Sequence, residues 1–494
     1  MARSYDALAI SDRAGRLPHR FARYDPTSPS LKMPLLWVAI GIALMLVLLL
    51  VVKLDAFFAL LLTSLAVALL NGMDLLGALQ SILKGIGATM GSVALVLVFG
   101  AMLGRLLDES GAAQAIATRL IELTGVRHVQ FAMATTGLLV GIAMLYNAGF
   151  LVLIPIVYTV ALATGLPLLY LGLPLAAALS VTHGFLPPHP APTFLAILYH
   201  ADVNRTLLVG LVAAIPACLI GGVLFGRLVR VRAMTPPDGF VQRAPLERDA
   251  QPGVGISIVV ALVPVILMLA NAIVDIAAGT SAIDPFRAGT DFRAQLAVAV
   301  PDPAVRTLVA SLKFFGNANV ALMIAVLVAL YALGLRRGRT MESLMKSLGG
   351  AVGSIAMILL IIAAGGAFSQ VLRDGGVSDY ITRQAAGMQV NPLLLAFGVA
   401  ALLRAAVGSA TVAGMTAASV VAPTALGSAV HPELMVLATG AGSLMFSHFN
   451  DTGFWMFKEY YNATIRETFL TWSVMELIVA LVGLAAALLL NLVW

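Results

Sequence analysis

The chain has 494 residues, of which 60% are hydrophobic and 11% are charged, and its mean hydropathy is +0.98. This composition excludes a soluble globular protein, because such a protein cannot hide so much apolar surface from water. The formal net charge is +6, but the basic residues lie mainly in tails and loops, and no motif supports a nucleic-acid partner. The single cysteine, Cys218, cannot form an internal disulfide.

Residues 1–34 are polar and contain scattered arginines. We expect a disordered basic tail, because the segment has neither the apolar stretch nor the cleavage site of a removable signal peptide. Runs with few or no charges follow at residues 35–52, 57–70, 93–107, 256–270 and 477–490. A membrane span needs about 20 apolar residues, and the neighbouring residues extend these runs to that length. The sequence predicts an all-α polytopic membrane protein with roughly 10 to 14 membrane segments.

An internal repeat organises the chain. The stretch GAMLGRLLDESG from Gly100 matches GGAFSQVLRDGG from Gly365, an offset of 265 residues (365 − 100). Further pairs at this offset are Gly149 with Gly414, Pro167 with Pro432 and His183 with His448. Matches of this kind without an insertion predict two homologous halves, at residues 35–228 and 255–494, joined by a linker at residues 229–254.

The charges that flank the two halves favour opposite orientations. The loop before the second half, GLRRGRTMESLMK, contains Arg336, Arg337 and Arg339, whereas the equivalent NGMDLLGALQSILK contains only one basic residue. By the positive-inside rule, the former loop and the basic linker 229–254 are cytoplasmic. The sequence therefore predicts inverted repeats. The sequence does not decide on which side of the membrane the N-terminal tail lies. The arginines of the tail indicate the cytoplasmic side, whereas the inverted arrangement places the tail outside.

Glycines, prolines and the few polar residues of the halves gather in four segments, at residues 145–155, 180–193, 403–423 and 443–460. Proline and glycine interrupt helices, and backbone groups freed in a membrane must face protein or a wet cavity. Such segments in repeated halves are typical of transporters, whose broken or re-entrant helices form a binding site near the middle of the membrane. We expect the four segments to meet at one cavity.

Three motifs, SVTHGFLPPHPAPT, RAAVGSATVAG and SHFNDTGFWMFKEYYNATIRET, resemble hallmark segments of the gluconate permease family, the gluconate:proton symporters. The resemblance extends from about Leu35 to the C-terminus. It implies a secondary active transporter of the bacterial inner membrane that imports gluconate or a related sugar acid, by proton symport with alternating access. One departure is Asn147, where the family usually has an acidic residue; an amide cannot bind or release a proton near neutral pH.

A sugar acid needs partners for one carboxylate and several hydroxyl groups. Ser409 and Thr411, flanked by glycines, suit a backbone-and-hydroxyl cradle, and Arg404 can balance the carboxylate or pair with Asp451. The candidate substrate-binding residues are Asn147, Thr182, His183, His189, Arg404, Ser409, Thr411, Ser447, His448 and Asn450. The structural alternatives are helix-end salt bridges for the arginine and hydrogen bonds to the preceding turn for the hydroxyls. Trp472 is interpreted as an interfacial anchor.

Proton coupling needs a group whose protonation changes with its exposure. Asp451 is the main candidate, because a carboxylate inside a membrane is costly unless it serves a pathway or a partner. His183 or His448 would assist it, since histidine titrates near neutral pH. Sodium coupling is the alternative, and it predicts dependence on external sodium.

A hydrolase within the membrane and a passive channel are the alternatives to a transporter. No cofactor and no metal site is expected, because the histidines do not follow the HExxH spacing of a zinc hydrolase and no GxSxG elbow is present. A passive channel is harder to exclude, since channels also line pores with polar residues. Within the transporter class, glycerate or a hydroxy-amino acid are the alternative substrates. The expected surroundings are the lipid bilayer, and a homodimer is left open.

Overall fold

The structure is a computed structural model that describes residues 34–229, 234, 246–280, 283, 291–377, 380, 390–426, 429–448 and 451–493. The described residues form helices and connecting turns, without a strand. This agrees with the predicted all-α class. The N-terminal tail and most of the linker lie outside the described residues, so the expected disorder of the tail stays a prediction.

Eight helical stretches of the described chain are long and apolar enough to cross a membrane. They are α3 (Leu75–Glu109), α6 (Tyr146–Thr164), α7 with α8 (Leu168–Leu198), α9 to α10 (Val203–Leu228), α11 (Val254–Ala277), α14 with its extension (Ala318–Arg337), α15 (Met341–Asp374) and α21 with α22 (Ile465–Val493). Shorter apolar helices are α1 (Pro34–Leu50), α2 (Ala56–Leu70), α17 (Pro392–Val407) and α18 (Ala410–Leu426). Eight full-length candidates together with short apolar helices make a polytopic membrane protein, as predicted.

The helix boundaries repeat along the chain. The helices α5 (Val129–Ala143), α6, α7 (Leu168–Phe185) and α8 (Pro190–Leu198) correspond, at the offset of 265 residues, to α17, α18, α19 (Pro432–Leu444) and α20 (Thr452–Tyr460). The packing repeats as well: α5 lies on α7 as α17 lies on α19, and α6 contacts α7 as α18 contacts α19. The local structure thus follows the sequence repeat.

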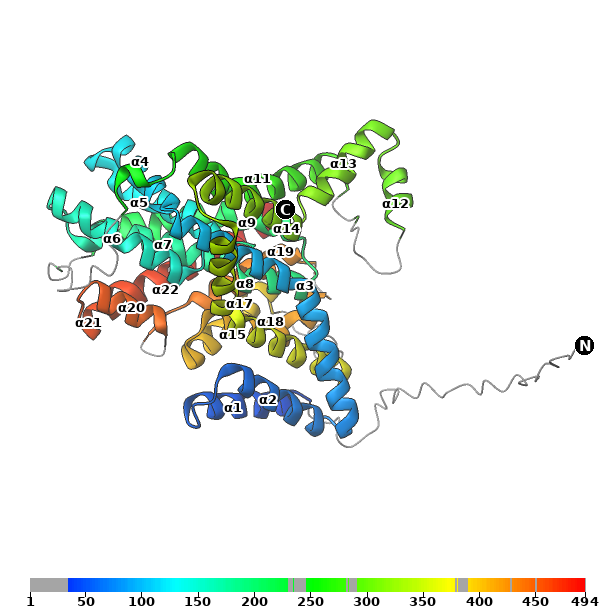
Figure 1. Ribbon diagram of the computed structural model, residues 1–494. Helices are drawn as coiled ribbons and strands as arrows, with labels where there is room; N and C mark the ends of the chain where they lie inside the picture. Colours follow the sequence, from blue (N-terminus) through cyan, green and yellow to red (C-terminus); the bar gives the residue numbers. More distant parts are fainter. Residues whose placement is uncertain are drawn as a thin grey trace, which may run out of the picture.

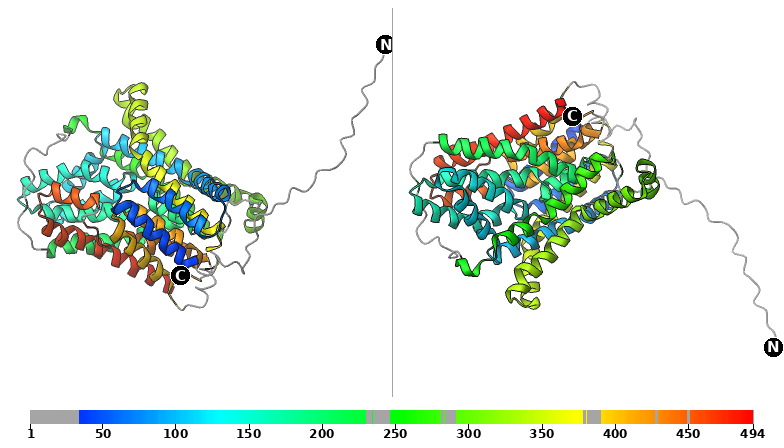
Figure 2. Two further views of the ribbon diagram at one scale, coloured as in Figure 1. Left: turned by 90° about the horizontal axis from the view of Figure 1, so that it is seen from below. Right: turned by 90° about the horizontal axis from the view of Figure 1, so that it is seen from above.

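The equivalent helices α3 and α15 lie side by side and run antiparallel (Figure 2). Near the start of α3, the Ser81 hydroxyl donates to Asp374 Oδ2 at the end of α15, over 2.8 Å. At the other end, Glu109 forms an ion pair of 2.9 Å with Arg339, just before α15 begins. This geometry supports the predicted inversion for one pair of equivalent helices, and the inversion of the complete halves stays a prediction.

Helix α7 is the centre of the molecule, since nearly all of its residues are buried. It crosses α19 closely: a Cβ at Gly440 would lie 2.2 Å from the carbonyl oxygen of Gly184. By contrast, α12 (Phe292–Ala299) and α13 (Pro303–Phe315) project from the body of the molecule, while α1 and α2 lie together along one side (Figure 1). The close crossing of α7 and α19 holds in place the chain segments that border the cavity described below.

Candidate functional site

The helices of both halves are interrupted at equivalent places. The interruptions separate α5 from α6, α7 from α8, α17 from α18, and α19 from α20, and they fall within or at the edge of the four predicted segments. Local sequence explains them: Gly408 ends α17 with a φ of +82°, a conformation that glycine adopts without strain, and Pro190 opens α8. The four interruptions border one cavity of about 1000 Å³, as expected from the sequence.

The first turns of several helices line this cavity. They contribute residues 146–148 of α6, Pro190 of α8, residues 410–412 of α18 and residues 452–453 of α20. The first turn of a helix presents unsatisfied N–H groups and the positive end of the helix dipole. Pro190 lacks an N–H group, and the N–H groups of Val412 and Gly453 donate to Ser409 and Asp451. The four helix ends therefore favour an anion mainly through their helix dipoles.

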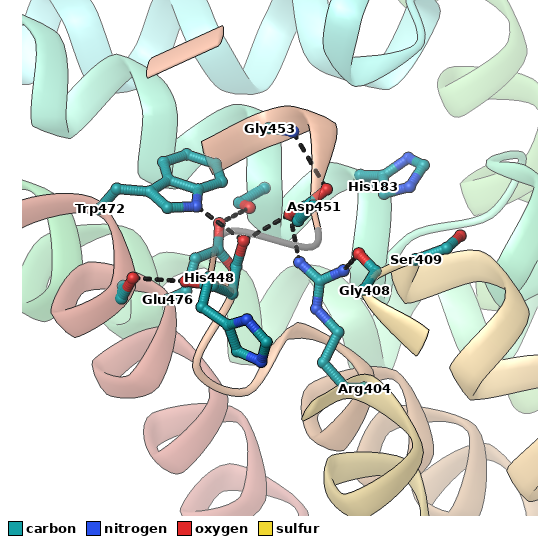
Figure 3. A network of polar contacts seen from close by, with 12 residues as sticks. His183, Arg404, Gly408, Ser409, His448, Asp451, Gly453, Trp472 and Glu476 are labelled. Atoms are coloured by element: carbon teal, nitrogen blue, oxygen red, sulfur yellow. Dashed lines mark hydrogen bonds and ion pairs between the residues drawn. The ribbon is translucent and has the colours of Figure 1, made fainter. Parts of the chain in front are cut away.

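An ion pair crosses the cavity wall between α17 and the N-cap of α20 (Figure 3). Arg404 Nη2 donates to Asp451 Oδ2 at 2.5 Å, and Arg404 Nη1 donates to the carbonyl oxygen of Gly408. The Arg404 side chain is 3% exposed and that of Asp451 is 14% exposed. Because the Gly408 carbonyl belongs to the break itself, the guanidinium ties the end of α17 to the start of α20.

The carboxylate of Asp451 is held by further donors. Ser447 Oγ donates to Oδ2, and the Gly453 backbone N–H donates to Oδ1 over 3.0 Å. Trp472 Nε1 donates to Ser447 Oγ over 2.8 Å. Trp472 is only 2% exposed, so its interpretation as an interfacial anchor is wrong: the ring packs inside the protein and supports the ion pair.

Six of the predicted residues line the cavity: Asn147, His183, Arg404, Ser409, Thr411 and Asp451. His183 comes from the first half and Thr411 from the second, and His183 Nε2 lies 3.5 Å from Thr411 Oγ1. The Ser409 hydroxyl accepts from the backbone N–H of Val412 over 3.3 Å at the start of α18. Hydroxyl and backbone groups thus lie together at this break, and their role as a substrate cradle stays a prediction.

Four predicted residues lie behind the cavity wall. Thr182 Oγ1 donates to the Leu179 carbonyl oxygen over 2.8 Å, and His189 Nε2 lies 2.6 Å from that of Gly141. Ser447 supports Asp451, as described above. The ring of His448 points away from the ion pair (Figure 3), and its Nε2 lies 2.8 Å from the Ala405 carbonyl oxygen. The structure thus places His183, but not His448, on the cavity wall. Asn450 lies outside the described residues.

Sequence reasoning missed Glu476 of α22 (Val474–Val493) and its partner Ser180 of α7. Both line the cavity, and the Ser180 hydroxyl donates to Glu476 Oε1. Tyr146 and Trp472 line it as well. A signal for Glu476 was present, since a carboxylate within the apolar stretch 465–493 is rare and costly.

Arg105, Asp108 and Gln114 line the cavity as well. Gln114 Oε1 accepts from the backbone N–H of Leu246, over 3.1 Å, at the end of the linker. Arg339, from the basic loop before the second half, pairs with Glu109, which follows Asp108 in α3. This part of the cavity lining therefore lies next to both segments that the sequence predicts to be cytoplasmic.

No three His, Cys, Asp or Glu side chains within the described ranges are grouped so that they could hold a metal ion. The rings of His183 and His189 lie edge to face with centroids 5.6 Å apart. The described part of the cavity lining therefore offers hydrogen-bonding groups and the charged side chains of Arg404, Asp451, Glu476, Arg105 and Asp108.

Comparison with known sequences finds relatives that are named transporters or permeases of gluconate or L-idonate. Over 459 residues the chain is 45% identical to the Gnt-II system L-idonate transporter of Escherichia coli, covering 93% of this chain and 99% of the relative. It is 44% identical over 461 residues to a high-affinity gluconate transporter of the same organism, covering 93% and 100%. The gluconate permease of Bacillus subtilis is 41% identical over 467 residues, covering 93% and 100%.

Solved structures support the fold. The YdaH transporter of Alcanivorax borkumensis matches 89% of this chain and 97% of its own, with a TM-score of 0.60 and 17% identity. MtrF of Neisseria gonorrhoeae matches 88% and 94%, with a TM-score of 0.61 and 14% identity. The model of the GntP family permeases matches residues 33–493. The chain is thus a multi-pass inner-membrane transport protein rather than an enzyme, and it belongs to the GntP permease family.

Proposed function

We propose that this permease imports gluconate or a closely related sugar acid by proton symport with alternating access. The observation that carries the proposal is the convergence of four helix N-termini and Arg404 on one cavity. Relatives named gluconate or L-idonate transporters, at 41–45% identity over 93% of the chain, support the substrate class. Glycerate and hydroxy-amino acids share the carboxylate and a hydroxyl group and are the alternative substrates.

The chemistry of a sugar acid matches the lining of the cavity. Its carboxylate suits the helix N-termini and the guanidinium of Arg404. Its hydroxyl groups suit side chains that both donate and accept hydrogen bonds, which here are Asn147, His183, Ser409 and Thr411. The volume of about 1000 Å³ lies at the upper end of ligand sites and leaves room for bound water.

Coupling to a proton follows from charge balance. Arg404 is already neutralised by Asp451, so an incoming anion adds an uncompensated negative charge to a low-dielectric site. If a cavity group takes up a proton at the same time, the bound state stays electrically balanced. From the sequence alone, the candidates for this group are Asp451, assisted by His183 or His448, and sodium remains the alternative ion.

One part of the cavity lining, formed by Arg105, Asp108 and Gln114, supports alternating access. It lies beside the linker and the basic loop that the positive-inside rule places in the cytoplasm. The described conformation would then face inward, and transport would require a second conformation in which the cavity opens on the opposite side.

Uptake of labelled gluconate into proteoliposomes tests this proposal. With an acidic exterior we expect accumulation above the external concentration, which a protonophore abolishes, and inhibition by excess unlabelled gluconate and L-idonate. A channel cannot concentrate its substrate. Accumulation that requires external sodium and withstands the protonophore would replace proton coupling by sodium coupling, and failure of every sugar acid to compete would contradict the substrate class.

A further inference from the structure

The carboxyl group of Glu476 borders the cavity, although its residue is only 1% exposed. It lies on α22, within the apolar segment Ile465–Val493, on the same wall as Trp472. The carboxyl group therefore forms part of the cavity wall. Figure 3 shows Glu476 on the far side of Asp451 from Ser409.

Two facts distinguish the surroundings of Glu476 from those of Asp451. Glu476 Oε1 accepts a hydrogen bond from the neutral hydroxyl of Ser180, and Oε2 has no hydrogen-bond partner among the described residues. Asp451, by contrast, is paired with Arg404 and accepts from Ser447 and Gly453. Two carboxyl groups of one cavity thus have different environments, which is the arrangement that separates their protonation states.

The charged and titratable groups around Glu476 come from α17, the N-cap of α20, α6 and α7. Arg404 of α17 and Asp451 before α20 interact with it electrostatically, and Tyr146 of α6 faces it with a buried phenol. From α7, the contact is the hydroxyl of Ser180, while His183 lines the same cavity one turn further along. The single guanidinium in this group is engaged by Asp451, so an ionised Glu476 would be a buried charge without a counter-ion of its own.

We propose that Glu476 is the residue that takes up the coupled proton, a proposal that rests on the proposed symport. On the acidic side, a hydronium ion in the cavity transfers its proton to the carboxylate of Glu476 and becomes water, and on the other side the carboxyl group returns the proton to a water molecule. With Glu476 ionised, the two carboxylates of Glu476 and Asp451 face the one guanidinium of Arg404, and this part of the cavity repels an anion. With Glu476 protonated, Arg404 balances Asp451, and the helix N-termini attract the sugar acid.

Glu476→Gln tests the assignment, because the amide has nearly the same shape and cannot titrate. Full-length protein in proteoliposomes is assayed for gluconate accumulation under a pH gradient, and for exchange of internal against external gluconate without one. For Glu476→Gln we expect accumulation to fall about tenfold while exchange stays within about threefold of the unmodified protein, because a carrier without its proton site still moves substrate but cannot concentrate it. Glu459→Gln, the same change at a side chain 57% exposed on α20, is the matched control and should preserve both activities.

The outcomes separate the two proposals. If the unmodified protein does not respond to a pH gradient, proton symport itself is wrong. The assignment to Glu476 is overturned if the pH gradient drives gluconate accumulation equally in the unmodified protein and in Glu476→Gln. It is also overturned if Asp451→Asn abolishes this accumulation and Glu476→Gln does not.

Ser180→Ala provides a second test that does not depend on recovery of folded Glu476→Gln. It removes the one donor to Glu476 among the described residues and so favours the protonated carboxyl group. Uptake should then reach its half-maximal rate at a higher pH than in the unmodified protein. An unchanged pH profile would overturn the assignment.

Discussion

The Arg404 side chain both forms structural hydrogen bonds and lines the cavity. Its two terminal nitrogens reach the Gly408 carbonyl oxygen and Asp451, and its guanidinium lines the cavity. A planar fork of donors can serve two acceptors at once, which the point charge of a lysine cannot do. The orientation of the positive charge toward an anion therefore depends on arginine and not on charge alone.

Arg404→Lys is expected to weaken gluconate binding about tenfold, because charge-assisted hydrogen bonds of fixed geometry are lost while the net charge is kept. Calorimetric titration of the purified protein with gluconate measures the effect. Arg205→Lys is the matched control: Arg205 pairs with Glu433 at 3.6 Å and does not line the cavity, so the affinity should stay unchanged. Equal affinities of Arg404→Lys and the unmodified protein would remove the guanidinium from the site.

At the scale of residues, the sequence predicted some of the site and not the rest. Pairing of Arg404 with Asp451 could be anticipated, because charged groups inside a membrane need partners. Glu476 was missed because it stands alone in the last apolar stretch, away from the glycines and prolines. His448 matches His183 in the repeat, yet its ring points to Ala405, since a repeat fixes the position along a helix and not the direction of a side chain.

The helices explain why the cavity exists where it does. Breaks recur at equivalent positions in the two halves, and the tight crossing of α7 and α19 at Gly184 and Gly440 brings the halves together beside them. The crossing leaves no room for a side chain, because a Cβ at Gly440 would meet the Gly184 carbonyl oxygen at 2.2 Å. Small residues permit this approach of helices in membranes.

Gly440→Ala is expected to destabilise the protein by roughly 1–3 kcal/mol, the usual cost of overpacking. Thermal unfolding of the detergent-purified variant measures it as a lower melting temperature. Gly349→Ala in α15 is the control, because a Cβ there meets no atom within 4 Å, and its melting temperature should not fall. A Gly440→Ala protein as stable as the unmodified one would show that the two helices can separate without cost.

The existence and the breaks of these helices could be predicted from the sequence, because hydropathy gives the apolar stretches and proline or glycine marks their ends. What could not be predicted was the packing. Burial of α7 along almost its whole length, or the position of Thr182 and His189 behind the wall, depends on contacts between segments far apart in the chain.

Over the whole molecule, the two halves contribute differently to the cavity. At the offset of 265 residues, Arg404, Asp451 and Glu476 correspond to leucines at positions 139, 186 and 211. The first half supplies His183, Asn147 and Ser180 instead. The two halves therefore share a repeated fold. The charged groups of the inner cavity, however, come from the second half, so the two halves do not contribute equally to the recognition of charge.

Whether a sugar acid binds in this cavity from the side predicted to be cytoplasmic is tested most directly by the rate at which a membrane-impermeant maleimide labels Ala148→Cys. Ala148 lines the cavity, and replacing the buried Cys218 by alanine removes the other thiol. In inside-out vesicles we predict rapid labelling that gluconate at ten times its dissociation constant slows about tenfold, with no effect of the uncharged glucitol. A labelling rate that saturating gluconate leaves unchanged would contradict the account.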